Sequence, residues 1–152
     1  MRVALRPLSI LVAAALAGGC GNSTGGSATG PGTPLEIAGT WSLTAHITNP
    51  TLAASCESQG TAAIGQSGGA LSGTANRVDD CTIGASHPAD TVAAPIDSGA
   101  VSGATASFRI GTCSYVGSIT GTPTDQMGGS TTCVLTFSGT RDTLVGTWHA
   151  SR

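Results

Sequence analysis

The sequence predicts an all-β domain, an up-and-down antiparallel meander of about eight strands closed into a barrel. The composition is unlike that of a helical bundle, with 23 glycines, one tyrosine, two tryptophans, two phenylalanines and 9 % charged residues. From about residue 37, apolar and polar residues alternate with period two between regularly spaced turn residues. We expect closure because eight meandering strands hide their edges when the last strand pairs with the first. A β-sandwich of similar strand count is the alternative.

The expected strands are short and mostly joined by tight turns. The clearest one covers residues 37–48, where Trp41, Leu43 and Ile47 share one face. An irregular loop is expected at residues 79–90, where aspartates cluster. The other strands are expected at residues 57–65, 70–78, 92–102, 105–111, 112–120, 126–137 and 143–151.

The cysteine positions provide an independent check on these hairpins. Pairing Cys56 with Cys81 centres the enclosed loop on the glycine turn at residues 66–69. Pairing Cys113 with Cys133 centres the second loop on Pro123, in another turn. Four cysteines allow three connectivities, and only this one centres both loops on turns. Each bridge is expected to contribute about 3 kcal/mol by restricting the unfolded chain.

Residues 1–19 resemble the signal sequence of a bacterial lipoprotein. Two arginines precede an apolar run at residues 8–17, which is shorter than the roughly 20 residues that span a bilayer. The segment Leu16-Ala17-Gly18-Gly19-Cys20 is similar to a lipobox, although its usual leucine position holds Ala17. A lipid on Cys20 leaves an even number of cysteines for disulfides. Ordinary signal cleavage, with Cys20 as a spare thiol, is the alternative.

The predicted mature chain begins with lipidated Cys20 and a flexible Gly/Ser/Thr/Pro tether over residues 20–35, followed by a barrel domain over residues 36–152. Loss of Arg2 and Arg6 leaves four of six basic residues against eight acidic ones, a net charge of about −4. This negative net charge does not favour binding to nucleic acid. It does not attract anionic lipid headgroups either, so membrane attachment is expected to depend on the lipid on Cys20. Gly21 resembles the residue after the cysteine in lipoproteins sorted to the outer membrane, facing the periplasm or the cell surface.

The end strands share a motif, Gly39-Thr40-Trp41 and Gly146-Thr147-Trp148. A Gly-x-Trp motif that opens an eight-stranded meander resembles the lipocalins and the wider calycin group, and residues 64–74 are similar to an early avidin hairpin. Lipocalins pack a late arginine over the first tryptophan, a role that the resemblance assigns to Arg152. It also implies that the barrel binds a small apolar ligand. The residues expected to line this cavity are Trp41, Phe108, Tyr115, Leu135 and Trp148.

Two other functions fit the same architecture. The protein is a structural or interaction lipoprotein of the cell envelope if side chains fill the barrel, and a free sheet edge or an apolar patch would favour this alternative. A mobile N-terminal stretch before a Gly-x-Trp barrel is also similar to small bacterial metalloprotease inhibitors. Lipidation at Cys20 would bury the free N-terminus that such an inhibitor needs.

No motif predicts catalysis, so we expect a non-enzyme without a cofactor or a metal. The match of residues 65–69 to Gly-x-Ser-x-Gly falls on a hairpin turn instead of the strand-to-helix turn of a hydrolase. His46 and His149 are expected on adjoining strands of the polar face, with no carboxylate near them in sequence. Asp79, Asp80 and Asp90 are expected in a solvated loop, where pairing with Arg77 is a weak surface effect.

Overall fold

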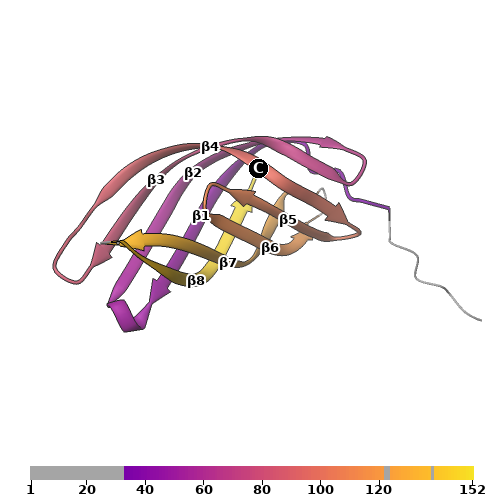
Figure 1. The fold of residues 1–152 in the computed structure, drawn as a ribbon. Coiled ribbons are helices and arrows are strands. Elements are labelled where there is room, and N and C mark those ends of the chain that lie inside the picture. Colours follow the sequence, from indigo (N-terminus) through magenta and orange to yellow (C-terminus); the bar gives the residue numbers. More distant parts are fainter. Residues whose placement is uncertain (1–32, 122–123, 138) are drawn as a thin grey trace, which may run out of the picture.

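The computed structural model describes residues 33–121, 124–137 and 139–152. The predicted signal sequence, the predicted lipidation site Cys20 and most of the predicted tether lie outside the described residues. Eight strands and one short 3-10 helix, η1, follow each other along the chain (Figure 1). The elements are β1 (Gly39–Asn49), η1 (Pro50–Leu52), β2 (Ala54–Ser67), β3 (Ala70–Ile83), β4 (Ala89–Ser102), β5 (Thr105–Ile110), β6 (Cys113–Thr120), β7 (Gln126–Phe137) and β8 (Thr140–Ser151).

The eight strands form a closed antiparallel barrel in which each strand pairs with its sequence neighbours and β8 pairs with β1. This confirms the predicted barrel and excludes the sandwich. Gly146 is essential to the closing ladder because it lies opposite Ile47, and a Cβ atom on it would come within 1.8 Å of the His46 carbonyl oxygen. A glycine here therefore lets the first and last strands approach to pairing distance.

The predicted irregular loop at residues 79–90 is wrong. β3 continues to Ile83 and β4 begins at Ala89, so only residues 84–88 connect the two strands. The aspartates that argued for a loop are tolerated because the ladder runs past them, pairing Glu57 with Asp80 and Asp79 with Asp90. Long-range pairing therefore overrides the weak strand propensity of aspartate.

One end of the barrel is closed by the segment before β1. Ile37 is fully buried, and its carbonyl oxygen accepts a 2.8 Å hydrogen bond from the indole Nε1 of Trp41. The Arg152 guanidinium lies 4.7 Å from the centroid of the Trp41 ring and donates to the Ala38 carbonyl at 2.8 Å. The arginine-over-tryptophan contact implied by the lipocalin resemblance is thus confirmed.

Both predicted disulfides, Cys56–Cys81 and Cys113–Cys133, are confirmed. Each joins residues directly opposite one another on adjacent strands. The bridges indicate an oxidising, non-cytoplasmic environment, consistent with export. Within the described ranges, no helix has the length and apolar character needed to cross a membrane.

Candidate functional site

The aromatic residues expected to line a cavity mostly pack against one another inside the barrel. The Phe108 and Tyr115 rings are stacked with centroids 5.1 Å apart, and Trp148 meets both edge-on, at 5.3 and 5.8 Å. All three side chains are buried, which places this cluster in the core. Trp41 lies under Arg152 at the closed end, and Leu135 is only partly buried.

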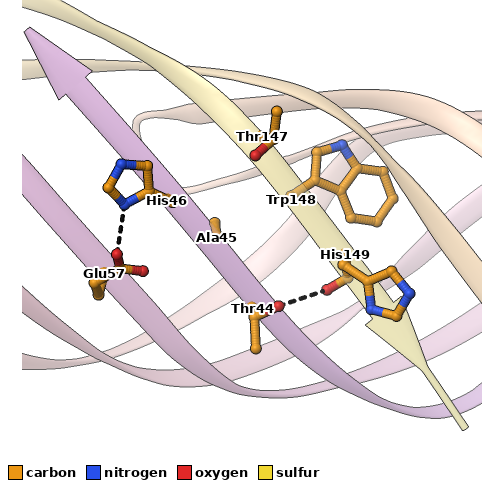
Figure 2. Close-up of a pocket in the computed structure, with 7 residues that line it drawn as sticks. All are labelled: Thr44, Ala45, His46, Glu57, Thr147, Trp148 and His149. Carbon is orange, nitrogen blue, oxygen red and sulfur yellow. Dashed lines mark hydrogen bonds and ion pairs between the residues drawn. The ribbon is translucent and has the colours of Figure 1, made fainter.

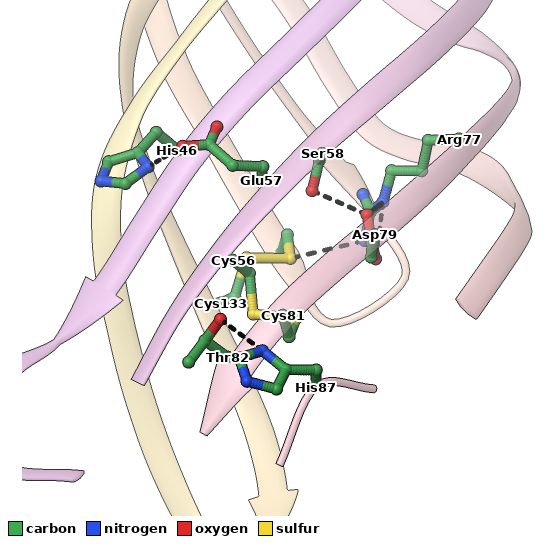
Figure 3. Close-up of a disulfide and its surroundings, with 11 residues drawn as sticks. His46, Cys56, Glu57, Ser58, Arg77, Asp79, Cys81, Thr82, His87 and Cys133 are labelled. Atoms are coloured by element: carbon green, nitrogen blue, oxygen red, sulfur yellow. Dashed lines mark hydrogen bonds and ion pairs between the residues drawn. A yellow bond between two sulfur atoms is a disulfide. The ribbon is translucent and has the colours of Figure 1, made fainter. Parts of the chain in front are cut away.

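A largely buried polar cluster of Ser58, Arg77 and Asp79 lies on β2 and β3 (Figure 3), and Arg77 joins it to the aromatic cluster through Tyr115. The guanidinium of Arg77 donates from Nε to Asp79 Oδ1 at 2.9 Å and from Nη1 to the Tyr115 hydroxyl at 2.9 Å. Ser58 Oγ donates to the same carboxylate oxygen at 2.7 Å. Burial raises the pKa of the Tyr115 hydroxyl, and the positive charge of Arg77 opposes part of this rise.

This cluster corrects the prediction that Arg77 makes a surface ion pair. Arg77 is only 7 % exposed, and its ion pair with Asp79 lies in the barrel wall facing the interior. The signal was present in the sequence, because Arg77 and Asp79 share strand parity with Leu71 and Ala75. Thr131 lies opposite Tyr115 on β7, and its buried Oγ1 has no hydrogen-bond partner among the described residues.

The two histidines expected on adjoining strands do lie on β1 and β8, but not on the same rung. His46 pairs with Thr147, and His149 pairs with Thr44 (Figure 2). Across the other ladder, Glu57 lies opposite His46, with 2.5 Å between Nδ1 and Oε1. The sequence prediction missed this carboxylate because the two residues are neighbours only through strand pairing. Within the part of the chain that the structure describes, no three His, Cys, Asp or Glu side chains are grouped to hold a metal.

Among the described residues, no strand pairs with the outer side of the first half of β4, which is therefore a sheet edge. Residues 89–95 pair with β3, whereas pairing with β5 begins only at Ile96. The cause is the short β5–β6 hairpin, which turns at residues 111–112 while the β3–β4 hairpin extends past it (Figure 1). On the far side of this gap, the last residues of β7 pair with β8 alone. The barrel wall therefore has a notch at the end opposite Ile37.

The orientation of the free backbone groups follows from one hydrogen bond. Cys81 N–H donates to the Pro88 carbonyl at 2.9 Å, so these two residues form a hydrogen-bonded pair. Hydrogen-bonded pairs alternate along an antiparallel ladder, and the N–H and C=O groups of Ala89, Thr91 and Ala93 therefore point away from β3. Pro95 has no N–H and ends the run of free donors.

Acidic side chains surround this edge. Asp90 lies on the edge strand itself, Asp80 lies opposite Ala89, and Glu57 lies opposite Asp80 one strand further away. Asp79 is the fourth carboxylate, and the neighbouring Arg77 compensates its charge. The free edge is therefore negatively charged. No protein family model, curated protein or solved structure matches this chain.

Proposed function

We propose that this protein is an exported, lipid-anchored envelope protein that works without catalysis by holding an extended segment of another envelope protein. The segment would add as a strand beside residues 89–93 of β4. The unpaired edge of an otherwise closed barrel supports this proposal most directly. Edges of this kind are normally covered or interrupted in stable proteins because they attract other strands.

The charge around the edge supports a basic partner segment. An added strand would run next to Asp90, which is on the inward face with Asp79, and one strand away from Asp80, which is on the outward face. Lysine or arginine side chains at neighbouring positions leave opposite faces of a strand and would approach one carboxylate each. Main-chain hydrogen bonds would supply most of the affinity, and the acidic flank would supply selectivity. The proposed segment is therefore extended, rich in Lys or Arg and free of proline at the pairing positions.

The placement of the edge suits a protein tethered at its N-terminus. Leu35 N–H donates to the Gly103 carbonyl, so the chain enters the barrel beside the β4–β5 turn. β4 begins at Ala89, at the other end of the same strand. With Cys20 lipidated in the outer membrane, the predicted tether at residues 20–35 would behave as a coil and reach roughly 20 Å from the membrane. The free edge of β4 would then face away from the anchoring membrane.

Site-specific photo-crosslinking in the native host tests the proposal. A photo-reactive amino acid in place of Ala93 is expected to form a discrete adduct with one envelope protein. The matched control is the same amino acid in place of Val145, which is 54 % exposed on β8, a strand paired on both sides. Equal adducts at both positions, or an adduct with a second copy of this chain, would overturn the proposal.

Two further variants test the backbone and the charges separately. Thr91→Pro removes a free N–H without removing a hydrogen bond to β3, so the adduct at Ala93 is expected to disappear while the protein stays folded. The double variant Asp80→Asn with Asp90→Asn is expected to weaken the adduct. An adduct that survives Thr91→Pro would contradict strand addition.

Carriage of a small apolar ligand is the second candidate function. Barrel closure and the partly buried Leu135 beside the notch support it. To enter the barrel, a ligand would have to push apart the packed rings of Phe108, Tyr115 and Trp148. We therefore prefer binding of a partner segment at the β4 edge. The two candidates differ in a readily measured property, the presence of a non-covalent small molecule in the purified protein.

A further inference from the structure

A second feature, on the outer face of the barrel where the β5–β6 hairpin borders the same notch, is formed by two arginine side chains. Four arginines lie in the described residues, and two have structural roles, Arg77 with Asp79 and Arg152 over Trp41. Arg109 and Arg141 form no ion pair within the described part of the chain, where Arg77–Asp79 and His46–Glu57 are the pairs observed. Within the described residues, Arg109 Nη2 donates one hydrogen bond of 3.4 Å, to the Gly111 carbonyl, and the remaining donors of the two guanidinium groups have capacity for an external anion.

Arg109 and Arg141 both border the same hollow, which measures about 250 Å³. The hollow forms where the β5–β6 hairpin stops and the β7–β8 hairpin continues. Arg109 lies on β5 opposite Ser114, and Arg141 lies on β8 opposite Thr136, so the two arginines line the hollow from strands on opposite sides of it. The remaining lining residues are Thr112, Ser114, Thr132, Val134 and Thr136, which supply four hydroxyl groups and no carboxylate.

We propose that this hollow binds a phosphate group. Guanidinium groups donate to phosphate oxygens in a bidentate manner, and serine and threonine hydroxyls complete such sites as further donors. The volume suits one phosphate group with a small substituent. The bound phosphate group would belong either to free phosphate or to a phosphate ester, including the headgroup of a phospholipid.

Two nearby aspartates limit the affinity of this site. Asp97 lies opposite Arg109 on β4 and is exposed, without forming an ion pair within the described residues. Asp142 follows Arg141 in β8, so the two side chains leave opposite faces of the strand. Asp97 therefore repels a bound anion more directly than Asp142 does. Removal of the Asp97 charge is expected to strengthen phosphate binding, an effect that general damage to the fold would not produce.

Calorimetric titration of the full chain in detergent, at low ionic strength, tests the proposal with three soluble probes. These are inorganic phosphate, glycerol 3-phosphate and glycerophosphoglycerol, a phospholipid headgroup without its acyl chains. Saturable binding is expected for at least one probe. Preference for the diester would identify a headgroup as the source, and preference for the other two would identify free phosphate or a monoester.

The variants distinguish a built site from general electrostatic attraction. Arg109→Gln with Arg141→Gln is expected to weaken binding at least about tenfold, Asp97→Asn to strengthen it, and Val116→Gln, on the outer face of β6, to leave it unchanged. The proposal is overturned if no probe shows saturable binding. It is equally overturned if the double arginine variant binds as the unmodified chain does.

Discussion

The terminal residue of the chain, Arg152, covers the tryptophan of the first strand, with its guanidinium carbon 4.7 Å from the centroid of the Trp41 ring. The same guanidinium donates to carbonyl oxygens of Ala38 and Thr124 and so connects the end of β8 to the segment before β1 and to the β6–β7 connection. One side chain therefore helps to close the barrel end at which the segment before β1 packs.

Arg152→Ala is expected to lower the free energy of unfolding by about 1–2 kcal/mol, because a cation–π contact and several hydrogen bonds are lost together. The free energy of unfolding of Arg152→Lys should lie between those of the unmodified chain and Arg152→Ala, since lysine keeps the charge but not the planar guanidinium group. Urea unfolding monitored by tryptophan fluorescence measures the effect. Arg141→Ala is the control, and an equal loss there would contradict a specific role for Arg152.

Gly146→Ala is expected to disrupt the closing ladder, with a loss of about 3 kcal/mol or more, because its Cβ would collide with the β1 backbone. Gly65→Ala is the matched control, since a Cβ there would lie 3.7 Å from its nearest neighbours. Thermal unfolding of both variants gives the comparison. Similar melting temperatures for the two would refute the close approach of β8 to β1.

The buried ion pair between Arg77 and Asp79 is expected to show strong coupling. Arg77→Met should lower the free energy of unfolding by about 3 kcal/mol because it leaves the mostly buried carboxylate of Asp79 without a positive partner. Replacing both residues, Arg77→Met with Asp79→Leu, should recover most of the lost stability. A double-mutant cycle in urea measures the coupling, and purely additive losses would place the pair at the surface.

The single tyrosine, Tyr115, provides a pH test of the core. Its pKa is raised above 10.0 in the folded chain, so folding favours the neutral phenol. The stability associated with this group is fully present below the unfolded pKa and is lost as the pH rises through the folded pKa. Absorbance titration should therefore give a higher midpoint in buffer than in urea. A midpoint in buffer at or below the urea value would mean that the phenol is solvated.

The predicted disulfides and barrel closure followed from local signals: glycine turns midway between cysteines and the repeated Gly-x-Trp motif at the two ends. Features that depend on register between distant segments were missed. Glu57 meets His46 only because β1 and β2 pair in one particular register.

The sequence analysis placed Arg77 at the surface because the side chain is charged. Its position two residues after Ala75 on the same strand nevertheless puts both side chains on the inward face. The free edge of β4 was hidden by strand length, because it exists only where the β5–β6 hairpin is shorter than its neighbours. Alternation and turn residues predict the order and faces of strands. They do not specify how far each ladder extends.

The central claim is that side chains fill the barrel, so that it acts through its outer surface and the β4 edge. Native mass spectrometry of the full chain, gently extracted from its host membrane, tests this claim most directly. We predict the mass of the lipidated chain, lighter by four hydrogens than its reduced form and without any small-molecule adduct that is lost on denaturation. A discrete non-covalent mass of a few hundred daltons that disappears on denaturation would contradict the claim and establish a ligand carrier.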